Sequence, residues 1–138
     1  MNMNPYLIFA GNCAEAMKFY EQTLGGTLTL MKNKDVPPGV PMPPGSEERT
    51  MHARLEFDGG TIMASDNMVG MQYDGMKNFS IAIAYDDLDE GKRIFEALAE
   101  GGRITMPFDK TFWVEGFGMC VDRYGTPWMV NGGKSFMS

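Results

Sequence analysis

The sequence has few of the residues on which most catalytic sites depend, and each shortage removes a class of function. It contains one histidine, His52, which excludes any site that needs two imidazoles. Its two cysteines do not make a disulfide framework. A net charge of −6 without any basic cluster argues against binding to nucleic acid, because nothing would neutralise the phosphates. We therefore expect no nucleic-acid partner.

Long hydrophobic runs are also missing. No apolar stretch approaches the roughly 20 residues needed to cross a bilayer, and residues 1–5 lack the basic start and apolar stretch of a signal peptide. We expect a cytoplasmic protein with no membrane partner. The composition, 43% hydrophobic and 22% charged, is typical of one globular domain with a sizeable core.

Sulfur-containing residues leave two questions open. Cys120 lies in an alternating apolar pattern and is predicted to be a small buried hydrophobe. Cys13 falls at the start of a predicted helix, where the helix dipole lowers a thiol pKa, so a nucleophilic role stays open although no base is near it in sequence. The fourteen methionines either fill the core or form a soft lining for a small apolar ligand.

The second half of the chain repeats the first. Asn12 and Asp87 each stand before a helical run with a Glu three residues later, a pattern typical of a helix N-cap, and they lie 87 − 12 = 75 positions apart. Gly60 and Gly125, in the last hairpin of each half, lie only 125 − 60 = 65 apart. An insertion in the first half, the proline-rich loop 34–48, accounts for both offsets. Such a loop is predicted to be either a lid or a mobile segment.

Each half reads as a strand, a helix and three strands. Leu7–Phe9 and Ile81–Ile83, in the strands that open the two halves, are apolar at successive positions, which predicts burial on both faces. A helix covers one face. The other half's sheet, a second subunit or a ligand would have to cover the other.

This arrangement, with the ending Asp122–Asn131, resembles the vicinal-oxygen-chelate superfamily, which includes glyoxalase I, extradiol dioxygenases and bleomycin-resistance proteins. The motifs that resemble its PhnB-like branch are Pro5–Phe9, Ala16–Tyr20, Leu24–Gly26, His52–Ala53, Ser65–Asp66, Phe112–Trp113 and Asp122–Asn131. The resemblance implies an α+β fold of two βαβββ repeats forming paired half-barrel cups. It also implies a single glyoxalase-like domain over residues 1–138, with repeats at about 5–66 and 79–131, and a homodimer.

The resemblance also places the metal-ligand positions of the superfamily's enzymes at Pro5, Ala64, Ser80 and Met129. The internal offsets agree with that placement, since 80 − 5 = 75 and 129 − 64 = 65. These four side chains do not suit a hard or borderline divalent metal, which needs carboxylates or imidazoles. We therefore expect no metal and no cofactor.

Two residues remain candidates for catalysis. His52 is either a general base or a hydrogen-bonded strand residue, and it shares a strand face with Arg54, a pair suited to an anionic group. Asp66 either points into the same cup as Ala64 or caps a turn. The predicted ligand-binding residues are Phe9, His52, Arg54, Ala64, Asp66, Ser80, Trp113, Met129 and Asn131.

These observations favour a PhnB-like protein that binds a small organic molecule in a metal-free cup. One alternative is a metal-independent isomerase, lyase or transferase that uses His52 or Asp66 as base. Another is a metalloenzyme with displaced ligands at His52, Glu56 and Asp66, and a purely structural dimer is a further one. Some PhnB-like sequences carry a ubiquinone-methyltransferase label, but the sequence shows no adenosylmethionine motif.

Overall fold

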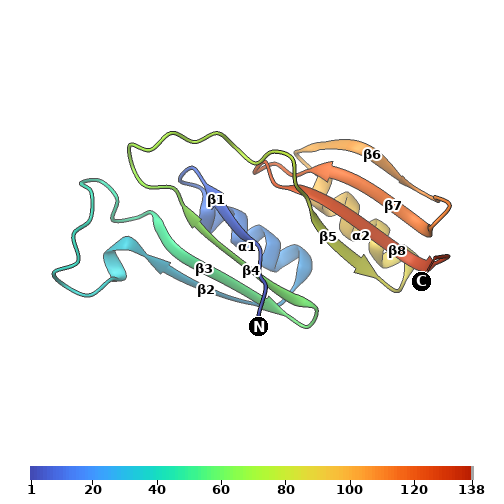
Figure 1. The fold of residues 1–138 in the computed structure, drawn as a ribbon, viewed down its shortest axis with the longest axis horizontal. Coiled ribbons are helices and arrows are strands. Elements are labelled where there is room, and N and C mark those ends of the chain that lie inside the picture. The colour runs from blue at the N-terminus through green and yellow to red at the C-terminus, as the bar shows by residue number, and fades with distance from the viewer. Residues whose placement is uncertain (138) are drawn as a thin grey trace. The chain divides into compact units, whose positions relative to one another are not determined.

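The computed structural model describes residues 1–137, and the chain divides into two compact units, Met1–Gly75 and Met76–Ser138. Each unit holds one βαβββ repeat, which confirms the predicted α+β class (Figure 1). No helix within residues 1–137 is long and apolar enough to cross a membrane.

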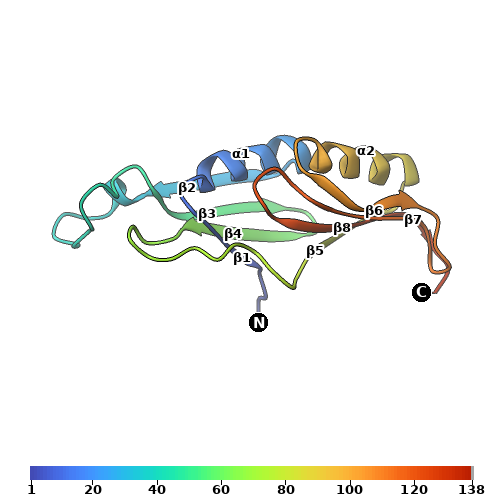
Figure 2. The ribbon, with the colours of Figure 1, turned by 90° about the horizontal axis from the view of Figure 1, so that it is seen from above.

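The first unit is a mixed four-stranded sheet with one helix along it (Figure 2). The strand order is β1-β4-β3-β2, in which β1 runs parallel to β4 and the other neighbours are antiparallel. Its elements are β1 (Tyr6–Phe9), α1 (Cys13–Leu24), β2 (Thr27–Lys32), a short 3₁₀ helix η1 (Asn33–Asp35), β3 (Thr50–Phe57) and β4 (Gly60–Asp66).

Only one face of this sheet is buried. Side chains alternate along a strand, so every second residue points toward α1. The buried set is Leu7, Phe9, Ala53, Leu55, Ile62 and Ala64 from the strands, with Cys13, Ala16, Met17 and Tyr20 from the helix. On the other face, Tyr6 and Ile8 are 43% and 40% exposed. The second face is therefore not covered within this unit, and its cover by the other half's sheet, a second subunit or a ligand stays a prediction.

The second unit repeats the plan, with the order β5-β8-β7-β6 and a parallel β5–β8 pair. Helix α2 packs so closely on β8 that a Cβ added at Gly91 would lie 2.7 Å from Cα of Gly132. A turn begins at Asp122, where Gly125 N donates to the Asp122 carbonyl oxygen at 3.0 Å. The elements are β5 (Ile81–Tyr85), α2 (Leu88–Ala99), β6 (Arg103–Asp109), β7 (Val114–Val121) and β8 (Pro127–Ser135).

The two helices are capped differently. Asp87 caps α2 as predicted, since its side chain accepts the backbone N–H of Glu90 at 2.8 Å. Asn12 makes no side-chain cap at α1, and that prediction is wrong. Asp66, at the end of β4, replaces it, because its Oδ1 accepts the N–H groups of Gly11 and Cys13 at 2.9 Å each.

The repeat is also shifted by one residue in the parallel strand pairs, β1–β4 and β5–β8. The helices start 88 − 13 = 75 positions apart, but β1 is joined to α1 by three residues and β5 to α2 by two. In the parallel pair of the first unit Leu7 lies opposite Ala64, and in that of the second unit Ile83 lies opposite Val130. The offsets between corresponding residues are therefore 83 − 7 = 76 and 130 − 64 = 66. Ala64 therefore corresponds to Val130 and not to Met129. A shift of one residue moves a side chain to the other face of the sheet.

The proline-rich loop is a folded excursion from the β2–β3 hairpin. Its neck is closed by backbone bonds from Asn33 N to the Arg49 carbonyl oxygen and from Lys34 N to that of Glu47, at 2.9 and 3.1 Å. The Glu48 carboxylate accepts from Nζ of both Lys32 and Lys34 at 2.8 Å. These two ammonium groups lower the pKa of Glu48 to about 2.

The close approach of α2 to β8 predicts that Gly91→Ala destabilises the protein. The added methyl would meet the backbone at Gly132, and such overpacking costs about 1–3 kcal/mol. Gly59→Ala is the matched control, because a Cβ there meets nothing within 4 Å. Urea unfolding of both variants measures the difference. Equal stability of the two variants would contradict the packing described for α2.

Candidate functional site

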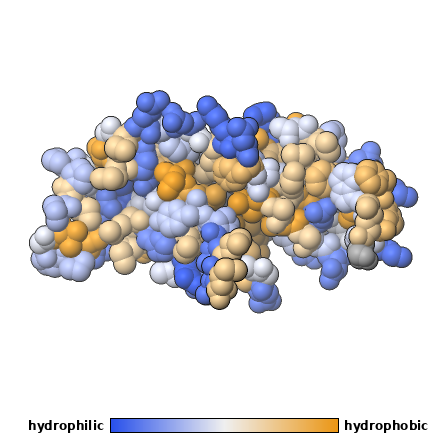
Figure 3. Space-filling model, in the orientation of Figure 1, coloured by the Kyte–Doolittle hydropathy of each residue, from blue (hydrophilic) through white to orange (hydrophobic). Residues whose placement is uncertain are grey.

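Each sheet has one face turned away from its helix, which we call its open face. The open face of the first unit carries Tyr6, Ile8, His52, Arg54, Glu56, Met63 and Ser65. The open face of the second unit carries Ala84, Phe117, Met119, Met129 and Asn131. Figure 3 shows hydrophobic residues beside hydrophilic ones on the visible surface of each unit.

His52 lies on the open face of the first unit and has an aromatic partner. Its Nδ1 is 3.2 Å from the hydroxyl oxygen of Tyr6, and the two rings are 5.7 Å apart. A β-bulge precedes it, because Met31 pairs with His52 while Lys32 pairs with Thr50, which leaves Met51 unpaired on β3. Bulges of this kind redirect side chains and are frequent beside functional sites. The imidazole is therefore held in place but remains half-exposed.

Arg54 shares this face with His52, as predicted from the period of two. Its Nε donates to Oε1 of Glu56 at 2.7 Å. The guanidinium is therefore engaged by a carboxylate two residues along the same strand. An anionic group bound beside His52 would have to share the guanidinium with Glu56, and this site stays a prediction.

Asp66 faces the opposite way, toward α1. Its Oδ1 takes the N–H groups of Gly11 and Cys13, and its Oδ2 takes the N–H of Thr50 at 2.8 Å. Both oxygens thus hold backbone donors from α1's N-terminus and from β3. This arrangement joins three segments, and it agrees with the capping interpretation of Asp66 rather than with a base that abstracts a substrate proton.

Two predicted ligand-binding residues belong to the core. Phe9 and Ala64 are both 0% exposed and lie on the face covered by α1. Their placement in a cup is therefore corrected. The cause is the one-residue shift in the parallel strand pairs, because Ala64 was aligned with Met129 across an offset of 65, whereas the paired strands give 66.

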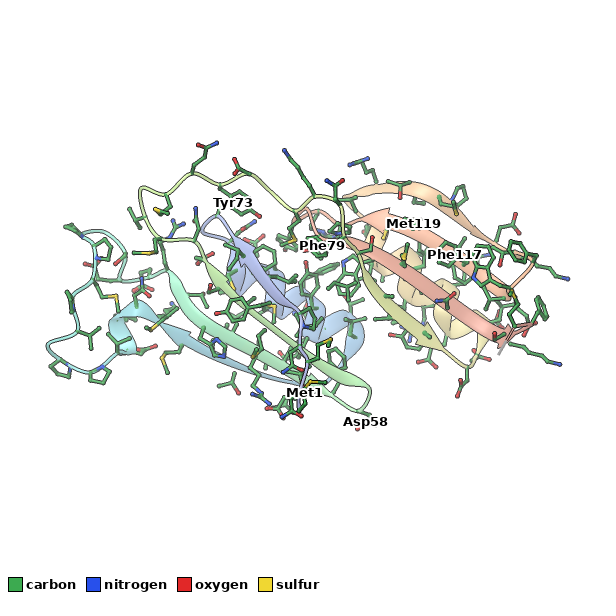
Figure 4. The ribbon with its side chains drawn as sticks, viewed as in Figure 1. Met1, Asp58, Tyr73, Phe79, Phe117 and Met119 are labelled. Carbon is green, nitrogen blue, oxygen red and sulfur yellow. The ribbon has the colours of Figure 1, made fainter. Side chains whose placement is uncertain are left out.

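Ser80 and Met129 come together in a pocket of about 670 Å³ in the second unit. Phe79 and Met119 also line it, and Figure 4 labels both, Met119 on β7 and Phe79 just ahead of β5. The remaining lining residues are Met76, Lys77, Asn78, Arg103, Thr105, Cys120, Val121 and Pro127.

Trp113 and Asn131 line a different pocket of about 590 Å³ in the same unit. The Trp113 ring packs against Phe117 at 5.3 Å and against Phe112 at 4.9 Å. The three aromatic residues therefore form a continuous group. Pro5 lies just ahead of β1, where it has no side chain able to bind a metal.

The metal implied by the wider fold family does not fit the residues present. Across residues 1–137, no group of three or more His, Cys, Asp or Glu side chains is close enough to hold an ion. The displaced set also fails, because Asp66 points toward α1 while His52 and Glu56 lie on the open face. That alternative is contradicted by the alternation of the strands.

The cysteines are buried, and neither suits nucleophilic chemistry. Cys13 is 0% exposed, and burial, helped by the charge of Asp66, raises its pKa to about 12. Burial and Asp122 raise the pKa of Cys120 to about 11. At neutral pH both thiols stay protonated, so the nucleophile interpretation of Cys13 is wrong and the core interpretation of Cys120 is confirmed.

Sequence reasoning missed Tyr6, Phe79 and Met119 as site residues. Tyr6 could have been found from the sequence. Side chains alternate along β1, so Tyr6 lies on the face opposite to Leu7, and β1 lies beside the β3–β4 hairpin that carries His52. For Phe79 and Met119 it was weak, since a methionine or phenylalanine pattern does not by itself show which face it occupies.

Asp66→Asn is expected to destabilise the protein by about 1–3 kcal/mol, because an amide nitrogen cannot accept the backbone N–H that its replaced oxygen held. Asp58→Asn, in the exposed β3–β4 turn (Figure 4), is the control and should change little. Thermal unfolding compares the two. A melting temperature for Asp66→Asn equal to that of the control would show that the carboxylate does not join these segments.

Comparison with known proteins identifies the family. Residues 1–131 match the family model described as 3-demethylubiquinone-9 3-methyltransferase. The chain is 35% identical to Protein YjdN of Escherichia coli (strain K12) over 95% of both chains. It is 45% identical to protein PA1353 from Pseudomonas aeruginosa, whose crystal structure it matches with a TM-score of 0.89 over 96% of this chain and 98% of the other.

More distant structures share the fold. A PhnB protein from Bacillus cereus, named as a 3-demethylubiquinone-9 3-methyltransferase, is 23% identical with a TM-score of 0.77 over 96% of this chain and all of the other. Glyoxalase I from Zea mays is 21% identical with a TM-score of 0.57, over 96% of this chain and 45% of that enzyme. The chain therefore belongs to the family described as 3-demethylubiquinone-9 3-methyltransferase, and it shares the glyoxalase-like fold.

Proposed function

We propose that the protein binds a small organic molecule on the open face of its second unit and needs no metal to do so. The observation that carries this proposal is the pocket of about 670 Å³ that brings Ser80 and Met129 together. Its volume falls within the range of small-molecule sites, about 300–1,000 Å³. Phe79, Met119 and Met129 supply an apolar wall that adapts to shape, since methionine is flexible and polarisable.

The charges of this pocket indicate the kind of ligand. Lys77 and Arg103 are its charged residues, and its lining contains no carboxylate side chain. This excess of positive charge contrasts with the net charge of −6 of the whole chain. An apolar body with one negatively charged or strongly polar group fits both the wall and the two cations.

A thermal-shift screen with small aromatic and aliphatic acids tests the proposal, because a ligand that binds only the folded state raises the melting temperature. We expect Met119→Lys and Met129→Lys to abolish the shift. Met71→Lys is the matched control, since Met71 is 63% exposed and does not line this pocket. S-adenosylmethionine belongs in the panel because of the family's description.

Two results would count against this function. One is a screen without any stabilising compound. The other is a shift that survives both pocket variants. A shift produced by S-adenosylmethionine alone would instead favour a methyltransferase. The homodimer and the cytoplasmic location remain predictions.

A second candidate function is a metal-independent enzyme with His52 as general base. The observation that favours it is the contact between His52 Nδ1 and the Tyr6 hydroxyl on an open, half-exposed face, where the phenol orients the imidazole. Asp66 is not the base in this version, because both of its oxygens hold backbone N–H groups.

His52→Gln tests this candidate on any compound that the protein converts. The rate should fall by about 10²–10⁴-fold, the usual contribution of a general base, while the melting temperature changes little. Tyr6→Phe should produce a smaller loss because it removes only the orienting hydroxyl. Turnover that is unchanged in His52→Gln would exclude the imidazole from the reaction.

A further inference from the structure

We propose a second binding site, in the first unit, for a small carboxylate with a short apolar chain. The site is a pocket of about 300 Å³ between the proline-rich loop and the adjoining ends of β3 and β4. It goes beyond the function proposed above, because it shares no residue with the pocket of the second unit. Its lining residues are Asn33, Pro41, Met42, Pro43, Ser46, Arg49, Thr50, Met51, Ser65, Asp66, Asn67, Met68 and Val69.

Arg49 supplies a positive charge that is oriented but not neutralised. Its Nε donates to the backbone oxygen of Asn67 at 3.2 Å, and its Nη2 donates to that residue's side-chain oxygen. Within residues 1–137 no carboxylate lies within 4.0 Å of the guanidinium, and its Nη1 makes no hydrogen bond. Binding of an anion would stabilise a half-buried guanidinium of this kind, because charge-assisted hydrogen bonds to the anion replace the hydration that burial removes.

The acidic residue in the pocket does not cancel this charge for a ligand. Asp66 accepts three backbone N–H groups, two of them at the N-terminus of α1, where the helix dipole is positive. These donors stabilise the negative charge of Asp66 and engage both of its oxygens within the fold. Glu48, an acidic residue of the loop neck, is paired with Lys32 and Lys34. Arg49 is therefore the charged residue of the lining whose side chain still has a hydrogen-bond donor for a ligand.

The rest of the lining is largely apolar and soft. Met42, Met51 and Met68 contribute thioethers, and Pro41 and Pro43 add rigid apolar rings on the loop side. Met51 projects into this region because it is the unpaired residue of the bulge beside His52. The volume is at the low end for ligand pockets, which sets an upper limit on the ligand. A monocarboxylate with a short unbranched chain matches this combination.

The closed neck of the loop keeps the site formed without a ligand. The side-chain amide of Asn33 donates to the Ser46 carbonyl oxygen at 2.9 Å, and the Ser46 hydroxyl donates to that of Pro43 at 2.6 Å. Ser46 is 1% exposed, so these bonds lie inside the loop. They hold the proline segment as one wall of the pocket. Little conformational entropy of the loop is therefore lost when a ligand binds.

Hexanoate is the probe, and hexanamide is its neutral counterpart. NMR of the whole chain with ¹³C-methyl-labelled methionine, its signals assigned by single Met→Leu variants, reads both pockets at once. We expect hexanoate to shift the methyl signals of Met42, Met51 and Met68. Hexanamide should bind at least about tenfold more weakly, because it lacks the charge that strengthens a hydrogen bond.

Arg49→Gln should weaken hexanoate binding at these signals by about tenfold or more, whereas Arg103→Gln, in the other pocket, should leave it unchanged. Met42→Trp is a second variant that keeps Arg49 and fills the space. It should abolish the shifts of Met51 and Met68 while the unshifted spectrum shows an intact fold. The spectrum of each variant is compared with the parent before hexanoate is added.

Several results would overturn the proposal. The first is that hexanamide binds as tightly as hexanoate. The second is that Arg49→Gln or Met42→Trp binds hexanoate as tightly as the parent protein. The third is that hexanoate does not shift the methyl signals of Met42, Met51 and Met68. A response confined to Met119 and Met129 would overturn this site while supporting the proposed function. A response at the first group alone would support this site and not the pocket of the second unit.

Discussion

The structure depends on the burial of one face of each sheet under a single helix. Strand alternation then decides the role of every side chain, because a residue on the helix side is core and its neighbour is free. In the first unit Ala64 is fully buried, while Met63 and Ser65 on either side of it are not. The same rule holds in the second unit, where Val130 is fully buried between Met129 and Asn131. The open faces are what remains for function.

Asp66 shows how closely the first unit couples this burial to its connections. The carboxylate at the end of β4 holds the start of α1 and the start of β3 through backbone N–H groups. In the second unit Asp87 caps α2 locally, and Gly132 stands where Asp66 would be, since 132 − 66 = 66. Glycine there lets α2 approach β8 closely. The repeats therefore share a plan but differ in how each helix is fixed to its sheet.

Much of the fold was predictable from the sequence, whereas the site was only partly so. The element order and the helix of the second unit followed from periodicity and from the capping pattern at Asp87. The cap of α1 did not, because Asp66 is 53 residues from Cys13 and no local pattern indicates such a bond. Local sequence patterns indicated the offset of 75 between the two helices, and the strands that open the two repeats were aligned with the same offset. One extra residue between β1 and α1 put Phe9 on the wrong face, and one extra residue in the β7–β8 turn did so for Ala64. Ser80 and Met129 line a pocket, and their role in binding stays a prediction.

Both proposed pockets present a cation to the ligand in a chain that is acidic overall. The pocket of the second unit combines a methionine and phenylalanine wall with Lys77 and Arg103, and that wall lies on the face that α2 leaves uncovered. The most direct test of this account is a measurement of intermolecular NOEs between a bound stabilising compound and the methionine methyl groups. We expect NOEs to Met119 and Met129 and none to Met17, a residue of α1 that is 0% exposed. NOEs to Met17 with none to the other two would contradict it.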